Sequence, residues 1–345
     1  MNYCGMDIGG KSSFIHLTNR KGRLLVRREV PTTREDLMEC LSPYIRHGLS
    51  IVIEAGNQTQ WIYRVLKDMG AQVVVVHPAQ VRLIAESRKK TDRIDAKTLC
   101  EQLRKNNLPH PVHMPSDSAR TLRGLLNARD QLVAARTRLC NTVRGMVRQE
   151  GIQLPARALS SQKGWEKLLG QGFSLTYLIP VIGSYFGAFK ALCASIRDLD
   201  RELAACERAD ARAARLRTMP KVGCIAALTF LGAVDDVKRF SSSRKLIAYS
   251  GLAPTVRSSS ERTVYGAITR AGRRELRRVW VQIAHLVAMD TGQASRPLRS
   301  WFNRVARRRG KKTAIVALAR RLLVIAYQLL KCETEYDPAR VKRAA

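Results

Sequence analysis

The chain has 345 residues, with 61 Lys and Arg against 28 Asp and Glu, which gives a formal net charge of +33. Hydrophobic residues make up 45% and charged residues 26%, a composition typical of globular proteins, and the length predicts two or three domains. Because a compact chain at this charge repels itself, the composition favours a polyanionic partner such as nucleic acid and argues against a purely metabolic enzyme or a secreted disulfide scaffold.

The cysteines and the first residues favour a cytoplasmic protein. The cysteines are scattered, with no CxxC pair and no Cys/His cluster, which predicts reduced thiols and excludes a zinc finger. The start of the chain, MNYCGMDIGGKSS, is not typical of a signal peptide, because an Asp interrupts its apolar stretch. No apolar run reaches the roughly 18 residues that a membrane span needs, so we expect no membrane partner.

The first third of the chain is predicted to be an α/β domain. Three antiparallel strands are expected in succession, and a helix capped by Thr33 or Thr32 follows them. Two short buried strands then enclose a second helix. The expected elements are the strands Tyr3–Ile8, Ser13–Thr18 and Arg23–Val30, a helix through Leu37 and Leu41, the strand Ser50–Glu54, a helix from Trp61 to Gly70 and the strand Ala71–Val76. This order, βββαβαβα, is the ribonuclease-H-like pattern.

Four carboxylates occupy particular places in this pattern. Asp7 lies near the end of the first strand and Glu54 ends the fourth strand. Asp92 and Asp95 are three residues apart at the start of a helix, so they share one face. Clustered anions are unfavourable unless cations join them, and Mg²⁺ is a hard ion that takes oxygen ligands. The four residues are therefore candidate metal ligands, although Asp92 alone could be an ordinary helix-start carboxylate that the dipole stabilises.

The middle of the chain is predicted to be a helical hairpin. It follows a linker with three prolines over residues 109–115. Apolar residues recur with coiled-coil-like spacing over residues 122–146 and again over residues 189–206, and Arg129 and Arg136 occupy two core-type positions. The pattern fits an intramolecular antiparallel hairpin or a dimerisation arm, and it does not separate these two interpretations.

The last third of the chain carries most of the excess charge. Residues 216–345 hold 27 basic and 8 acidic side chains, against 18 and 11 in residues 1–105. We therefore expect the last third to make most of the contacts with phosphates. The alternative is a well-solvated helix surface around RRELRR and ARRRGKK.

Two segments of the last third contain candidate functional residues. The sequence MPKVG, residues 219–223, precedes an apolar helix and either presents backbone N–H groups to a phosphate or forms a simple Pro/Gly turn. The serines at 258–260 lie among Arg257, Arg262 and Arg270. A serine in such surroundings can contact a phosphate or attack it, although a serine run taken alone is mostly just a loop.

The chain resembles, almost end to end, the DEDD transposases of the insertion-sequence 110/1111 family, which includes the pilin-gene-inverting recombinases. The resemblance lies in GMDIGGKS around Asp7, VIEAG at Glu54, KTDRIDAKTL at Asp92 and Asp95, MPKVG, and the block from YSGLAP to AITRAGRRELRR. The KTDxxDA segment and the GLxP-to-AG block are its specific parts.

This resemblance implies a fold and a cofactor. The implied domains are a RuvC-like α/β domain over residues 1–108, a coiled-coil hairpin over 109–215, a mainly α-helical transposase domain over 216–335 and a basic tail over 336–345. The implied active site is composite, with Asp7, Glu54, Asp92 and Asp95 as its four acidic residues. These carboxylates would bind Mg²⁺, two ions per site, with Mn²⁺ as a substitute.

The resemblance also implies a serine nucleophile that attacks DNA from the C-terminal domain. The serine of this family commonly lies five residues after the proline of GLxP, which is Ser259 counted from Pro254. Counting back from Ala271 and Gly272 favours Ser258 instead. Contacts with nucleic acid are expected from Lys221, Arg257, Arg262, Arg270, Arg273 and Arg274.

The partners that the resemblance implies are donor and target DNA, a structured non-coding bridge RNA, and a second copy of the chain in a homodimer that joins into a tetramer. The setting would be the bacterial cytoplasm, at the nucleoid. Two other interpretations stay open. One is a RuvC-like, junction-resolving nuclease in which water attacks DNA, and the other is a non-enzymatic protein that packages RNA or DNA by charge alone.

Overall fold

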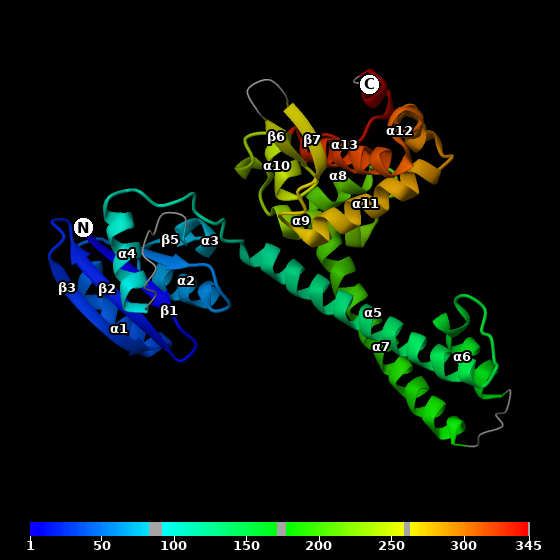
Figure 1. Ribbon diagram of the computed structural model, residues 1–345, viewed down its shortest axis with the longest axis horizontal. Helices are drawn as coiled ribbons and strands as arrows, with labels where there is room; N and C mark the ends of the chain where they lie inside the picture. The colour runs from blue at the N-terminus through cyan, green and yellow to red at the C-terminus, as the bar shows by residue number, and fades with distance from the viewer. Residues whose placement is uncertain (83–91, 171–176, 259–262, 344–345) are drawn as a thin grey trace. The chain divides into compact units, whose positions relative to one another are not determined.

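The computed structural model describes residues 1–82, 92–170, 177–258 and 263–343 (Figure 1). Ser259, Ser260 and Arg262 lie outside the described residues. The chain forms two compact units, Met1–Met114 and Pro115–Ala345.

The first unit is built on a mixed sheet of five strands. The strands are β1 (Asn2–Ile8), β2 (Ser12–Asn19), β3 (Leu24–Pro31), β4 (Leu49–Glu54) and β5 (Gln72–Val76). Their order in the sheet is β3-β2-β1-β4-β5. Strand β2 is antiparallel to both β1 and β3, whereas β4 is parallel to both β1 and β5. The predicted succession of strands is confirmed. Alternation of apolar and polar residues and short buried apolar runs are strong local signals for strands, which is why the sequence predicted them.

Helices cover both faces of this sheet. Helices α1 (Arg34–Ile45) and α2 (Thr59–Asp68) share a core with alternate residues of the strands, such as Met6 and Ile53. The opposite face carries α4 (Asp92–Arg104), whose Leu99 packs with Val52 of β4. A short helix, α3 (Pro78–Arg82), follows β5. The expected cap of α1 is Thr33, whose Oγ1 accepts a hydrogen bond from Asp36 N at 3.1 Å.

The second unit begins with a two-helix arm, α5 (Asp117–Gln149) and α7 (Leu178–Ala209), as Figure 1 shows. Arg129, at a core-type position of α5, donates to Asp200 of α7 at 2.5 Å, which explains an arginine at that position. The far end of the arm also contains α6 (Gln162–Leu169), where the buried Trp165 ring lies 5.2 Å from that of Phe189. The heptad spacing predicted that the second helix starts at Phe189. In the structure α7 starts at Leu178, eleven residues earlier.

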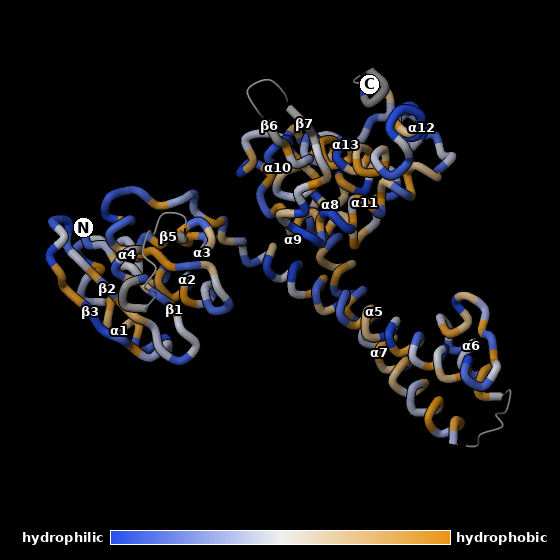
Figure 2. The backbone as a smooth tube through the Cα atoms, in the orientation of Figure 1, coloured by the Kyte–Doolittle hydropathy of each residue, from blue (hydrophilic) through white to orange (hydrophobic). Residues whose placement is uncertain are grey.

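Two helices of this unit are long and apolar enough to cross a membrane by length and composition alone. They are α7 and α13 (Lys311–Lys331), and they correct the expectation that no segment reaches this length. The expectation counted uninterrupted apolar runs, whereas a span tolerates one or two charged residues. In α13, 61% of the apolar window is buried in the unit, as in a core helix, but in α7 only 17% is buried. Figure 2 shows the hydrophobic residues along the outer part of α7.

The rest of the second unit is mainly helical. Its elements are α8 (Ala211–Arg217), α9 (Cys224–Val234), α10 (Ser243–Tyr249), the antiparallel strands β6 (Pro254–Ser258) and β7 (Thr263–Ile268), α11 (Arg274–Met289), α12 (Arg296–Arg309), α13 and α14 (Pro338–Arg343), with short 3₁₀ turns at 158–160, 237–239 and 293–295. The apolar helix expected after MPKVG is α9. Its Phe230 meets Trp280 of α11 edge to face, with ring centroids 5.6 Å apart, in the centre of the core.

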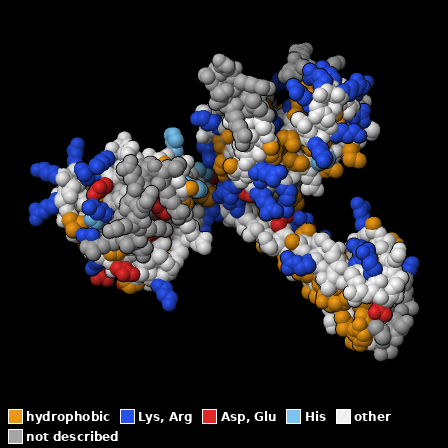
Figure 3. Space-filling model, viewed as in Figure 1, with side chains coloured by type: hydrophobic (Ala, Val, Ile, Leu, Met, Phe, Trp, Pro, Cys, Tyr) orange, Lys and Arg blue, Asp and Glu red, His pale blue; other side chains and the backbone are white. Residues whose placement is uncertain are grey.

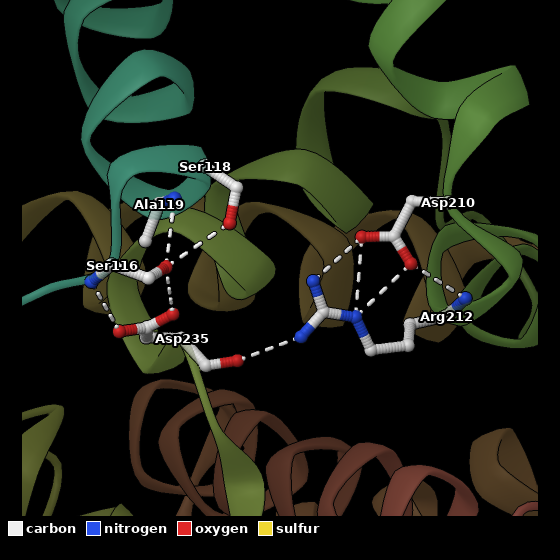
Figure 4. A network of polar contacts seen from close by, with 6 residues as sticks. All are labelled: Ser116, Ser118, Ala119, Asp210, Arg212 and Asp235. Atoms are coloured by element: carbon white, nitrogen blue, oxygen red, sulfur yellow. Dashed lines mark hydrogen bonds and ion pairs between the residues drawn. The ribbon is translucent and has the colours of Figure 1, made fainter.

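A polar network attaches the arm to this helical core (Figure 4). The Asp235 carboxylate accepts hydrogen bonds from Ser116 N at 2.8 Å and Ser116 Oγ at 2.6 Å, and Ser116 Oγ caps α5 by accepting from Ala119 N. Arg212 donates to the Asp235 carbonyl at 2.9 Å and pairs with Asp210 at 2.7 Å. The start of α5, the end of α9 and the start of α8 are thus joined through one aspartate.

Candidate active site

Asp7 and Glu54 occupy neighbouring positions at the same end of the sheet. The parallel strands β1 and β4 pair from Asn2 with Leu49 to Met6 with Ile53, so Asp7 and Glu54 come next on each strand. Residues in register on parallel strands point to the same face. Both side chains are half-buried. Two carboxylates that are 47 positions apart in the chain are therefore brought side by side by strand pairing.

Gly5 brings helix α4 to that same face. A Cβ atom at Gly5 would lie 2.1 Å from the Ala96 carbonyl oxygen and 2.5 Å from Cys100 N, so only glycine permits this approach. Side chains alternate along a strand, and Gly5 and Asp7 are two residues apart, so they share the face that α4 covers. The same alternation on β4 places Glu54 on the face of Val52, which packs with Leu99 of α4.

The direction of α4 brings its first turn to the carboxylates. Cys100 Sγ donates to the Tyr3 carbonyl at 3.2 Å, whereas Ala96 lies beside Gly5, so the start of the helix lies toward the Asp7 end of β1. Asp95, half-buried, precedes Ala96 directly. Asp92 is the first residue of α4 and is one helical turn before Ala96, on the same side of the helix. Its side chain lies outside what the structure describes.

Hydrogen bonds hold the loops beside the carboxylates. Thr59 Oγ1 donates to the Glu54 carbonyl at 2.9 Å and accepts from Gly56 N at 2.6 Å, which closes the turn after β4. Gln58 Nε2 donates to the Gly10 carbonyl at 3.0 Å and thereby ties this turn to the one after β1. The ends of both strands are held in place from within the unit.

The donor atoms at this end of the sheet suit a hard divalent cation. Asp7, Glu54 and Asp95 offer carboxylate oxygens, the ligands that Mg²⁺ prefers. Among the residues whose side chains are described, no group of three or more His, Cys, Asp or Glu is arranged to hold a metal ion. The carboxylate oxygens of these three residues are suitable ligands for Mg²⁺. The side chain of the fourth candidate, Asp92, is not described by the structure.

A buried histidine lies under α4 on the same face. His16 of β2 pairs with Gly5 and is only 6% exposed. Its Nδ1 has no hydrogen-bond partner among the described residues. Burial, with Arg27 and Lys97 nearby, lowers its pKa from the usual 6.5, and Glu101 opposes this effect.

We expect His16 to make stability depend on pH. Because the folded pKa lies below the unfolded one, the unfolded state binds more protons, so stability is lost as the pH falls below about 6.5. The loss cannot exceed about 1.4 kcal/mol per pH unit for one group. Urea unfolding of the full chain between pH 8 and 5 measures it, and His16→Leu should flatten this part of the profile. An unchanged profile in His16→Leu would contradict the assignment.

The serine-bearing segment of the second unit is carried by the β6–β7 hairpin. The strands pair Pro254 with Ile268 and Ser258 with Thr263, so Ser258 is the last described residue of β6. The predicted nucleophile Ser259 and Arg262 follow outside the described residues. Arg257 lies on β6, and its side chain is not described either.

The base of this hairpin is held by two glycines with positive φ. A Cβ atom at Gly272 would lie 2.2 Å from the Tyr249 carbonyl oxygen, and one at Gly251 would lie 2.7 Å from that of Ala271. Arg277 joins the two segments, because its Nη1 donates to the carbonyls of Ser250 and Arg270, each at 3.1 Å. The sequences YSG and RAG are thus interlocked, which explains why both contain glycine. Sequence reasoning did not identify Arg277 as a functional or structural residue, although it lies in the arginine-rich segment RRELRR.

The predicted phosphate-binding residues have different surroundings. Lys221, with φ of +62°, pairs with Asp290 at 3.0 Å in the turn before α9. Arg273 donates to the Tyr249 hydroxyl at 3.0 Å and to Glu275 at 3.3 Å. Arg270 and Arg274 are exposed beside the hairpin base.

Sequence reasoning also missed Arg123 of α5, which joins the arm to this region. Its guanidinium donates to the Gly232 and Ala233 carbonyls at the end of α9. Burial and the neighbouring Arg273 lower the pKa of Arg123. Arg123 and Arg273 line a cavity of about 480 Å³ between α5, α9 and α11. No local signal in the sequence marks Arg123, because its partners are backbone carbonyls more than a hundred residues away.

Comparisons with known proteins place the chain among transposases. A DEDD family model described as a transposase matches residues 4–151, and a model of the transposase IS116/IS110/IS902 family matches residues 213–298. The transposase for insertion sequence element IS1328 of Yersinia enterocolitica is 28% identical over 94% of this chain and 95% of its own length. The transposase for IS1111A of Coxiella burnetii is 28% identical over 83% and 79%. A probable family 20 transposase of Pseudomonas aeruginosa is 26% identical over 97% and 98%.

Proposed function

The chain belongs to the IS110/IS1111 family of insertion-sequence transposases, and we propose that it cleaves and exchanges DNA strands with a metal-binding acidic site in its first unit and a serine in its second. The observation that carries the proposal is the register of β1 and β4, which places Asp7 and Glu54 side by side on the face that α4 covers. The strand order β3-β2-β1-β4-β5 supports a RuvC-like assignment for this unit.

In this proposal, Asp7, Glu54, Asp92 and Asp95 hold Mg²⁺ or Mn²⁺. The bound ion would supply positive charge to the non-bridging oxygens of a scissile phosphate, which lowers the barrier to attack. Through the ion that they hold in place, the carboxylates would also orient the phosphate relative to the attacking group. The half-buried position of Asp7 and Glu54 supports this role, because burial strengthens their electrostatic interactions.

Ser259, or Ser258 one position earlier, is the proposed nucleophile. Its hydroxyl oxygen forms a bond to phosphorus while one P–O bond to DNA breaks. The proton that the serine loses is balanced by the proton that the departing DNA oxygen gains. A strand end of the partner DNA then reverses the step, so the phosphodiester energy is conserved and no ATP is required.

Basic residues near the hairpin complete the proposal. Lys221, Arg257, Arg262, Arg270, Arg273 and Arg274 would neutralise DNA phosphates during strand exchange. The exposed positions of Arg270 and Arg274 support their part in this role. The resemblance also supports guidance by a structured bridge RNA and a homodimer that joins into a tetramer.

Metal dependence tests the proposal directly. Purified full-length protein, together with the RNA that co-purifies with it, is incubated with DNA that carries both ends of the insertion sequence, and nicked and joined products are separated on denaturing gels. We expect products with Mg²⁺ or Mn²⁺ and at least a hundredfold fewer with EDTA, because the carboxylates alone repel the phosphate. Restoration by added Mg²⁺ is the control. Equal product formation in EDTA would contradict the acidic site.

A further inference from the structure

Helix α12 carries many arginines and no acidic residue that could neutralise them. Its sequence, RPLRSWFNRVARRR, contains six arginines and no carboxylate. Arg304, Arg307, Arg308 and Arg309 are exposed, and none of the ion pairs found in the described parts of the chain includes them. Figure 3 shows Lys and Arg side chains gathered over this helix. Like charges at this spacing repel one another, so an anionic partner is favourable here.

Trp301 lies on the same side of α12 as two of these arginines. Arg304 and Arg308 follow it by three and seven residues, which are positions on one helical face. Arg321 of α13 lies over the Trp301 ring at 4.9 Å from its centre. Burial and the nearby Arg304 lower the pKa of Arg321, which agrees with excess positive charge between the two helices.

A cavity of about 650 Å³ opens beside Trp301. It lies between α13 and the segment 332–340 and is lined by Trp301, Tyr336, Arg320, Arg321 and Arg340, together with apolar residues of α13. Two carboxylates, Glu335 and Asp337, also line it, and Asp337 pairs with Arg340 at 3.7 Å. Its size is within the range of about 300–1,000 Å³ of pockets that hold small ligands. Tyr336 is held in place, since its hydroxyl donates to the Ala294 carbonyl at 3.0 Å, and burial raises its pKa to about 12.

We propose that this face, defined by Trp301, Arg304, Arg308 and the adjoining cavity, binds single-stranded DNA, with phosphates on the arginines and one unpaired base in the cavity. Aromatic rings beside a positive surface are the features by which proteins bind single strands. A base within a duplex is stacked and paired, so only an unpaired nucleotide reaches such a cavity without that penalty. DNA is the occupant because the inference rests on the proposed function, in which strand exchange frees DNA strands.

Fluorescence anisotropy of the full-length protein tests this site. The probes are a labelled single-stranded DNA of about fifteen nucleotides, its duplex, the RNA of the same sequence, and an abasic strand of equal length. We expect Trp301→Ala to weaken binding of the single strand at least tenfold and to leave binding of the duplex and the abasic strand unchanged. Trp301→Phe should restore most of the affinity, which separates stacking from misfolding.

The salt dependence separates the roles of the two kinds of residue. Arg304→Ala combined with Arg308→Ala should lower the slope of log affinity against log salt by about 1.4, because each phosphate on a single strand contributes about 0.7. Trp301→Ala should leave that slope unchanged. The matched control is Arg197→Ala combined with Arg208→Ala, which removes the same charge from exposed positions of α7.

Two outcomes would overturn the site. One is unchanged affinity of Trp301→Ala for the single strand, and the other is tighter, Trp301-dependent binding of the RNA, which would make RNA the occupant. This experiment measures the affinity for DNA, whereas the catalytic proposal is tested by measuring DNA cleavage in variants of the acidic residues. Failure of one proposal is therefore distinguishable from failure of the other.

Discussion

Replacing Asp7 by Asn is expected to reduce the rate of DNA cleavage at least about a thousandfold, which corresponds to about 4 kcal/mol of lost transition-state stabilisation. The substitution keeps the size of the side chain but removes the negative charge that would hold a divalent cation. Asp7 lies at the end of β1 beside Glu54, so the loss falls on a site shared by two strands. Single-turnover cleavage at saturating protein measures the effect.

Glu54→Gln should have a similar effect, and the double variant should be little worse than either single one. Residues that act as one unit give non-additive losses, because the first substitution already disables the site. Asp68→Asn is the matched control, since Asp68 is an exposed carboxylate of the same unit and the change in charge is identical. DNA affinity should stay within about twofold in all of these variants. Cleavage at the wild-type rate by Asp7→Asn would contradict the acidic site.

Replacing Ser259 by Ala is expected to abolish strand exchange and the covalent link between protein and DNA. The expected loss is about ten-thousandfold or more, since no other group would take over a covalent step. Denaturing gels with end-labelled DNA detect the link as a band that protease treatment removes. Binding of DNA should persist, because the basic residues that are proposed to contact its phosphates are unchanged.

Ser258→Ala is the informative partner of this variant. If Ser259 is the nucleophile, Ser258→Ala should retain most of the covalent complex, and loss in Ser258→Ala alone would move the nucleophile to Ser258. Cleavage that persists in both variants without a covalent complex would favour a RuvC-like nuclease that uses water. That result would contradict the serine mechanism while leaving the acidic site intact.

Local pattern was sufficient to predict most elements of the first unit. Alternation in residues 12–19 and the β-branched run in 72–76 predict strands that the structure contains. In the second unit the same reasoning placed the helices around Leu122 and Leu203 but not α6. This helix has only eight residues and follows a Gly- and Pro-containing segment, so its periodicity is too short to detect.

Arginines were the least predictable residues, because their partners are remote. Arg129 lies at a core-type position, where an apolar residue is usual, and it pairs with Asp200 across the two helices. Arg277 and Arg123 bind backbone carbonyls of distant segments. A guanidinium has five N–H donors and accepts many geometries, so its sequence position alone does not indicate its partner.

The amino-acid sequence alone establishes the excess of positive charge, the succession of helices and strands, and the kinds of side chain available for phosphate chemistry, because all three depend on composition and local periodicity. Only the tertiary structure places Asp7, Glu54 and the first turn of α4 close together. Their proximity depends on the register of β1 with β4 and on the approach of Ala96 to Gly5. Alternation along a strand restricts which face each residue takes, but the pairing of β1 with β4 and the docking of α4 are set by contacts between residues far apart in the chain.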